Sequence, residues 1–389
     1  MNIRQVKTPE VRVDVRYLAQ LGIKAYGTDN LYPQKVAQII DASPTGSQCL
    51  ERYIRFIEGN GFEVLDFAEM TVNSLGETAD DLCAQSASDL ARYGGFALHV
   101  DYNIFGEVTE VRSVPFEACR LAEDDDSGYI GRVYYHADWR GKRTRNGHQL
   151  RVNRESIKDY PVFNPLPEVV QAQIAAAGGI ENYKGQILYV GMSRGSIYPK
   201  TKYDAALTEL STDEGLANVK YRNVRNNFLT SSILITRKSM SLDEAHAGYP
   251  NSGYSQELAQ FQGDTTALNI MEIVLDVNEE KPELMEFPTK NFDKDFTATE
   301  ESTTERIYSI FEQEPFLAIR NGKLGFSGDV IQDAYNYYSA LCGRERRVIE
   351  RAYAQVFGKW SGGSPTDDYT IAPLVFSTDE EITLNDEQL

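Results

Sequence analysis

The residues that could carry chemistry in this chain are few and far apart. The four histidines, His99, His136, His148 and His246, include no pair at the i, i+4 spacing that lets two imidazoles share a metal on one helix face. A lone histidine on a strand is more often a hydrogen-bonded structural residue. The sequence therefore predicts no histidine metal site and no cofactor.

Other catalytic patterns are equally weak. Gly191-Met192-Ser193-Arg194-Gly195 has glycines at the spacing of a nucleophile elbow, but with arginine directly after the serine it is more typical of a strand-ending turn. No phosphate-binding loop of the G-x-x-x-x-G-K-[ST] or G-x-G-x-x-G type is present. Residues 124–126, three aspartates, could bind Mg²⁺ or Ca²⁺, but further spaced ligands are missing and a solvated turn is favoured.

Composition narrows the class of protein. The chain has 389 residues, with 58 acidic and 39 basic side chains and a formal net charge of −19. A protein that wraps nucleic acid over most of its surface needs a basic footprint, which excludes that class. A protein past which nucleic acid slides without sticking is not excluded. The length indicates two domains, or one large body with an insertion.

The sequence shows no pattern typical of a signal peptide, of a membrane helix or of paired cysteines. We expect no secretory signal, because the opening residues lack a basic region followed by an apolar core. No apolar run reaches the ~18–20 residues of a membrane helix, so no membrane partner is expected. The cysteines form no C-x-x-C pair, which indicates reduced, buried thiols: Cys49, Cys83, Cys119 and Cys342.

The elements of the first half predict a mixed α+β body. Helical spacing of apolar residues predicts helices over 33–40, 49–57 and about 75–93. A hairpin is expected over 95–102 and 107–112, with further strands at 131–136 and 186–190. Residues 138–170 are polar, basic and dotted with proline, which indicates a surface excursion.

The second half has a different plan. A heptad-like seam predicts a helix of some 25 residues, and its members are Tyr203, Leu207, Leu210, Ala217, Tyr221, Val224 and Phe228. Strands at 232–235 and 268–275 flank a polar stretch, and a helix over 297–312 follows, with Ile307, Ile310 and Phe311 near its end. A glycine-bearing loop from 314 to 328 precedes a long helix over 329–357. From residue 361 onward the composition is that of a mobile acidic tail.

Two local basic clusters stand out in this acidic chain. Arg320 and Lys323, with Asn321 between them, occupy the glycine-bearing loop with almost no acid nearby. Lys220, Arg222 and Arg225 lie at the C-terminal end of the heptad helix, where the helix dipole favours cations.

The order of these elements resembles that of tailed-phage portal proteins, the head–tail connector rings. The motifs that carry the resemblance are Gly27-Thr28-Asp29-Asn30-Leu31-Tyr32-Pro33, Arg55-Phe56-Ile57-Glu58-Gly59-Asn60-Gly61-Phe62, Val114-Pro115-Phe116-Glu117-Ala118-Cys119-Arg120-Leu121, Gly131-Arg132-Val133-Tyr134, Ala137-Asp138-Trp139 and Glu312-Gln313-Glu314-Pro315-Phe316-Leu317. The last of these has Glu-Pro-Phe where the family often has Val-Pro-Pro.

The resemblance implies a division of the chain. Its parts would be a wing body at 1–199, a first stem helix at 200–229, a β-rich clip at 230–296, a second stem helix at 297–312, a tunnel loop at 313–328, a long wing helix at 329–360 and a mobile acidic tail or minimal crown at 361–389. The stem helices would pack through the heptad residues and through Ile307, Ile310 and Phe311. Arg320, Asn321 and Lys323 would face DNA.

The resemblance also implies a function. It would be a homo-oligomeric ring of about twelve subunits at the capsid vertex of a virion, assembled in host cytoplasm and without catalysis of its own. Double-stranded DNA would pass through the channel. Terminase large subunit, a head–tail adaptor, and the major capsid and scaffolding proteins would be its partners. Two alternatives stay open: an acidic soluble hydrolase with an inserted β domain, since paired carboxylates need only spatial closeness, and another minor capsid or head–tail connector protein.

Overall fold

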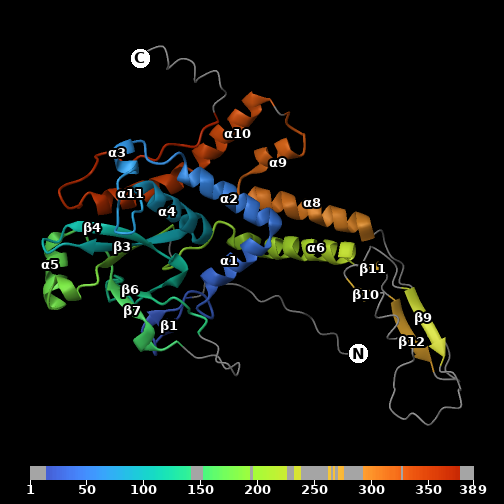
Figure 1. The fold of residues 1–389 in the computed structure, drawn as a ribbon, viewed down its shortest axis with the longest axis horizontal. Coiled ribbons are helices and arrows are strands. Elements are labelled where there is room, and N and C mark those ends of the chain that lie inside the picture. Colours follow the sequence, from blue (N-terminus) through green and yellow to red (C-terminus); the bar gives the residue numbers. More distant parts are fainter. Residues whose placement is uncertain are drawn as a thin grey trace, which may run out of the picture. The chain divides into compact units, whose positions relative to one another are not determined.

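The computed structural model describes residues 15–141, 152–192, 196–225, 292–325 and 327–376, and four short strands between 232 and 275. The side chains of those strands, of residues 222–225 and of residues 292–295 lie outside the description. The chain is α+β, as predicted, and forms two compact units (Figure 1). The first comprises Met1–Ser211 with Thr304–Leu389, and the second is Thr212–Thr303.

Three N-terminal helices of the first unit form where local signals place them. They are α1 (Tyr32–Ala42), α2 (Pro44–Glu58) and α4 (Ala79–Tyr93). Ser43 ends α1 and caps α2, since its hydroxyl accepts a hydrogen bond from the Gly46 amide at 2.9 Å. Thr78 and Asp81 form a reciprocal capping box, which starts α4 later than the predicted residue 75. A single turn, α3 (Leu65–Ala68), lies between α2 and α4.

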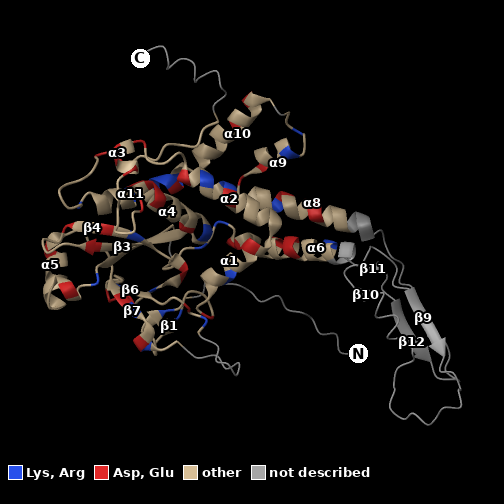
Figure 2. Cartoon of the chain, viewed as in Figure 1, with Lys and Arg blue, Asp and Glu red and all other residues tan. Residues whose placement is uncertain are grey.

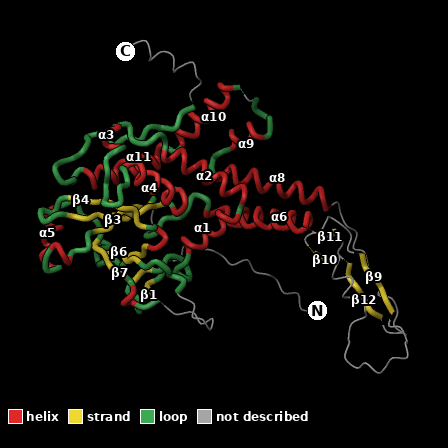
Figure 3. Tube along the Cα trace, viewed as in Figure 1, coloured by secondary structure: helices red, strands yellow, loops and turns green. Residues whose placement is uncertain are grey.

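The strands of the first unit form small antiparallel sheets. The order β4-β3-β8 joins β3 (Gly95–Tyr102), β4 (Val108–Val114) and β8 (Gln186–Gly191), which confirms the predicted hairpin. A second sheet joins β5 (Cys119–Leu121), β6 (Arg132–Tyr135) and β7 (Lys158–Pro161), and β1 (Tyr17–Leu18) pairs with β2 (Ile23–Lys24). Figure 3 shows these strands gathered beside the helices of the same unit. Within the described residues, 3₁₀ turns connect several of these elements, at Phe116–Ala118, Arg154–Ser156, Ile180–Asn182 and Asp204–Ala206.

The prediction of a surface excursion over 138–170 was wrong for its described part. This stretch contributes β7 and the start of α5 (Pro167–Ala176), and it buries Trp139, Ile157, Phe163 and Val170. The polar composition hid these apolar anchors because they are single residues spaced too widely to form a periodic pattern.

The main core of the first unit is aromatic-rich. It gathers buried side chains from α1, α2, α4, the β4-β3-β8 sheet and the C-terminal helices, among them Tyr26, Phe56, Phe96, Phe116 and Tyr353. A separate small core of Ile23, Tyr134, Trp139 and Ile157 lies under the β5-β6-β7 sheet.

One helix carries the chain from the first unit into the second, and another carries it back. They are α6 (Leu207–Arg225) and α8 (Phe292–Ile310), which start seven residues later and five residues earlier than the predicted bounds 200 and 297. In the second unit, β9 (Ser232–Arg237) pairs in parallel with β12 (Ile270–Leu275), and β10 (Gln262–Gly263) pairs with β11 (Thr266–Ala267).

The predicted loop over 314–328 is half helical. Helix α9 (Glu314–Arg320) forms because Pro315 occupies its first turn and Glu314 favours its N-terminus. The predicted single helix over 329–357 is two helices, α10 (Gly328–Leu341) and α11 (Gly343–Phe357). Gly343 weakens the helix at the junction, and Arg346 stabilises the break by donating hydrogen bonds to the carbonyls of Ser339 and Phe56 at 2.7 and 2.8 Å.

The prediction of a mobile tail from residue 361 was wrong for residues 361–376. Ile371 is 1% exposed, and its segment pairs with residues 60–63 through backbone hydrogen bonds of 2.8–3.0 Å. Gly59 makes this possible: its φ is +66°, and a Cβ there would lie 2.1 Å from the Ala372 carbonyl oxygen. Residues 377–389 lie outside the described chain.

Candidate functional site

The base of the helix pair is built into the core of the first unit. The ring of Tyr203 stacks on Phe311 with centroids 5.8 Å apart, and the Tyr203 hydroxyl donates to the Arg92 carbonyl at 2.7 Å. Leu210 and Ile307 are fully buried, and Leu207 and Ile310 pack against the same core. The chain itself therefore covers this part of the predicted seam.

Beyond the base, α6 and α8 run antiparallel. In the first unit, Arg306 Nη1 lies 3.5 Å from Glu209 Oε1. In the second unit, Lys220 pairs with Glu300 and lies over the Phe296 ring, 5.9 Å from its centroid. These contacts hold the two helices side by side along both described stretches.

The outer part of the seam is only partly described. Tyr221 is 61% exposed, so it is the described seam residue with the least cover from its own chain. Val224, Arg222 and Arg225 lie on α6 with side chains outside the description, and Phe228 lies outside the described residues. Lys220 is exposed, as a cation of a basic cluster would be.

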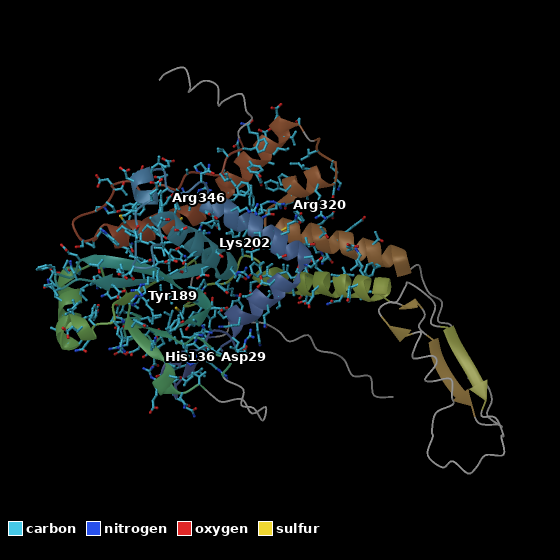
Figure 4. All side chains as sticks on the ribbon, in the orientation of Figure 1. Asp29, His136, Tyr189, Lys202, Arg320 and Arg346 are labelled. Atoms are coloured by element: carbon cyan, nitrogen blue, oxygen red, sulfur yellow. The ribbon has the colours of Figure 1, made fainter. Side chains whose placement is uncertain are left out.

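Gln313 fixes the junction between α8 and α9. Its side chain is fully buried, accepts a hydrogen bond from Arg52 at 2.7 Å, and donates to the Cys49 carbonyl at 2.9 Å and to the Tyr338 hydroxyl at 2.8 Å. The preceding Glu312 has φ +57°, a left-handed conformation unusual for a residue with a Cβ. Lys202, labelled in Figure 4, pairs with Glu312 at 2.7 Å.

The three predicted tunnel-loop residues are all exposed, at the end of α9 and just beyond it. Gly322, with φ +68°, ends the helix in a Schellman motif: its amide bonds to the Ile319 carbonyl and the Lys323 amide to that of Ala318. Arg320 (Figure 4) lies 3.4 Å from the Tyr308 hydroxyl. No carboxylate of the described residues lies within 4 Å of Arg320 or Lys323. Figure 2 shows Lys and Arg positions in blue on α9 and on the connection between α9 and α10.

Arg120 is a residue that the sequence reasoning did not single out. Its side chain is fully buried, and all five of its N–H groups donate hydrogen bonds, the acceptors being Asn30 Oδ1, the carbonyls of Asn30, Glu117 and Cys119, and Gln34 Oε1. The guanidinium also lies over the rings of Trp139 and Tyr26, at 5.0 and 5.6 Å. The motifs at 27–33, 114–121 and 137–139 thus meet at one buried cation. A single arginine inside an apolar strand was the available signal.

Buried acid and thiol groups are structural. Burial raises the pKa of Asp89 to about 7, although its carboxylate accepts a hydrogen bond from the Phe116 amide at 3.2 Å. The four cysteines are free and buried, as predicted. Burial raises the pKa of Cys119 and of Cys342 to about 12, so neither thiol is an activated nucleophile.

The metal and catalytic patterns have plain structural roles where they are described. Asp124 pairs with Lys24 at 2.6 Å, Asp125 accepts hydrogen bonds from Ser127, and His99 Nε2 lies 2.7 Å from the Lys184 carbonyl. Residues 193–195, His148 and His246 lie outside the described chain. Among the described residues, no three His, Cys, Asp or Glu side chains are placed to share a metal. No described helix is long and apolar enough to cross a membrane.

Comparison with solved structures finds components of gene transfer agent particles. A chain of the virion of a native gene transfer agent particle is 13% identical, with a TM-score of 0.46 over 84% of this chain and 81% of that one. A chain from the neck of the native particle, computed with C12 symmetry, is 14% identical with a TM-score of 0.48, covering 84% of this chain and 82% of that chain. A neck chain of the empty particle, computed with C6 symmetry, has the same values. No family model and no curated protein matches the chain.

Proposed function

We propose that this chain is the portal-type subunit of a phage-like particle, a non-catalytic ring protein through which double-stranded DNA passes. The observation that carries the proposal is the antiparallel pair α6 and α8, which encloses residues 226–291 as an insertion while its base is locked into the α+β unit. This is the stem-and-clip order that the sequence resemblance implies.

Charge supports a conduit. Each copy brings a net charge of −19, so most of a ring would repel a duplex that carries one negative charge per ~1.7 Å. Repulsion keeps DNA mobile in a channel, provided that sparse cations give brief, screened contacts. Arg320 and Lys323 have the required features, since both are exposed and neither is neutralised by a described carboxylate. We further propose that about twelve copies form the ring. Its partners would be terminase large subunit, a head–tail adaptor, and the major capsid and scaffolding proteins.

Oligomeric state tests the proposal directly. Native mass spectrometry of the purified chain should give one dominant species near twelve times 43.8 kDa, and end-on images should show a ring with a central hole. A monomer or dimer that turns over a small substrate would instead identify the hydrolase alternative. A ring that binds no terminase would identify another connector component.

A double variant tests whether Arg320 and Lys323 face DNA in the channel. Arg320→Glu with Lys323→Glu should leave ring mass unchanged and shorten the packaged genome, because the loop would then repel DNA. Lys158→Glu with Lys359→Glu is the matched control, since both lysines are exposed and the charge change is equal. Equal genome length in the two variants would refute the tunnel-loop role.

A further inference from the structure

The first unit contains a cavity of about 700 Å³ that belongs to none of the elements discussed as stem or tunnel. It lies between the β1-β2 pair, the turn at 29–30 and the described parts of the connection between β6 and β7. Its apolar floor consists of Leu18, Leu21 and Val152, which pack on the small core of Ile23, Tyr134, Trp139 and Ile157.

The polar wall of this cavity is cationic. Arg16, Arg140 and Arg154 line it from three separate segments, and all three are exposed. Among the described lining residues the one acid is Asp29 (Figure 4), whose carboxylate is paired with Lys35 at 2.7 Å. The described lining, with three arginines and one aspartate, therefore carries a net charge of +2 in a chain whose net charge is −19.

The arginines are partly pre-positioned. The Arg154 guanidinium lies over the Tyr134 ring, 4.4 Å from its centroid, and that ring is 7% exposed. The Arg140 guanidinium nitrogens lie 2.9 and 3.2 Å from one terminal atom of the Gln38 side-chain amide, and because a guanidinium only donates hydrogen bonds, that atom is assigned as the amide oxygen. No carboxylate of the described residues lies within 4 Å of Arg16 or Arg154.

Local sequence adds an independent observation. Residues 140–154 contain six Lys or Arg and no Asp or Glu, in a chain with 58 acidic and 39 basic residues. Dense basic runs of this kind are typical of polyanion-binding patches. Part of the run lies outside the described residues, and the cationic side chains of the site are Arg16, Arg140 and Arg154.

We propose that this cavity binds the phosphate backbone of DNA, as a second contact distinct from Arg320 and Lys323. Guanidinium groups present paired donors that match phosphate oxygens. A duplex carries one phosphate charge per ~1.7 Å of its axis and can therefore offer phosphates to several guanidinium groups, whereas a single carboxylate would leave most of the three cations unpaired. The choice of DNA over an acidic polypeptide as the ligand rests on the proposed function. The existence of a cationic site is independent of that function.

The test is the salt dependence of DNA binding by the full-length protein. Fluorescence anisotropy of a labelled 20-base-pair duplex, measured from 50 to 300 mM salt, gives the slope of log K against log salt. Arg16→Gln, Arg140→Gln and Arg154→Gln together should reduce that slope by about 2–3 and lower affinity at 50 mM salt at least ~10-fold. The control triple Arg132→Gln, Arg347→Gln and Arg351→Gln removes equal charge from exposed positions outside the cavity.

The outcomes separate this inference from the proposed function. The cavity site is overturned if the triple variant of Arg16, Arg140 and Arg154 keeps the wild-type salt dependence, or if the control variant loses as much salt dependence. This holds even where native mass spectrometry shows rings. If the triple variant loses salt dependence but the wild-type chain forms no rings, the cavity site is supported and the portal proposal is refuted. Displacement of DNA by polyglutamate at equal charge concentration would identify an acidic polypeptide as the ligand and overturn DNA.

Discussion

Replacement of Arg120 probes the node where three distant motifs meet. Its guanidinium donates five hydrogen bonds of 2.6–3.4 Å to neutral oxygens, with no carboxylate among the acceptors. Arg120→Met removes every donor but keeps an apolar body of similar length. Arg120→Lys keeps the charge but offers three donors at one point instead of five in a planar fork.

The magnitudes follow from the acceptors left behind. Each neutral acceptor that stays buried without a donor typically costs about 1–3 kcal/mol, and part of that total is offset because no buried charge remains. We therefore expect Arg120→Met to lower the free energy of unfolding by about 3–5 kcal/mol. Arg120→Lys leaves at least two acceptors unpaired, at about 1–1.5 kcal/mol each, so about 2–3 kcal/mol is expected.

The assay is urea unfolding followed by tryptophan fluorescence. The chain has two tryptophans, and the Trp139 ring lies 5.0 Å from the Arg120 guanidinium, so its emission reports on this node. With an m-value of about 3 kcal/mol/M, the Met variant should lower the urea midpoint by about 1–1.7 M. Phe replacement of Trp360 isolates the Trp139 signal.

Two results would contradict the reasoning. A Met variant within about 1 kcal/mol of wild type would mean that the five acceptors find other partners or water. If the Lys variant is destabilised as much as the Met variant, the positive charge contributes nothing to stability at this position, and the planar geometry of the guanidinium accounts for the whole effect.

Three further predictions concern the same unit. The pKa of Asp89 in the folded state, about 7, exceeds the unfolded value near 4, so the stability that its bound proton contributes is fully present below pH ~4 and is lost as the pH rises through 7. Asp89→Asn should thus gain about 2–3 kcal/mol relative to wild type as the pH rises from 5 to 8 in urea titrations. Gly59→Ala should expose the C-terminal segment to limited proteolysis, while Gly76→Ala, equally left-handed but with open space around it, should not. Leu210→Asp should abolish soluble expression by burying an unpaired charge, and normal folding of this variant would mean that α6 does not dock as described.

Local signals decided a large part of the fold. The prolines and caps at 33, 43–44 and 78–81 start α1, α2 and α4, and alternation with a turn at 103–106 makes the β3-β4 hairpin. These features act within a few residues, so a single sequence contains them. Fold class was predictable for the same reason.

Long-range contacts were not predictable. The heptad seam is apolar whether a neighbouring subunit or Phe311 of the same chain covers it, and periodicity does not identify the partner. The segment at 361–376 looks like a tail by composition, yet Ile371 is buried because residues 60–63 offer it backbone partners. Pairing of this kind depends on groups some 300 positions away.

The amino-acid sequence by itself determined the N-terminal helices α1, α2 and α4, the β3-β4 hairpin, the acidic balance and the basic positions at 320 and 323. Tertiary structure alone decided that Arg120 becomes a buried hub and that Arg16, Arg140 and Arg154 line one cavity. The physical reason is that charge and periodicity are properties of a segment, whereas burial and convergence are properties of the segments that fold against it.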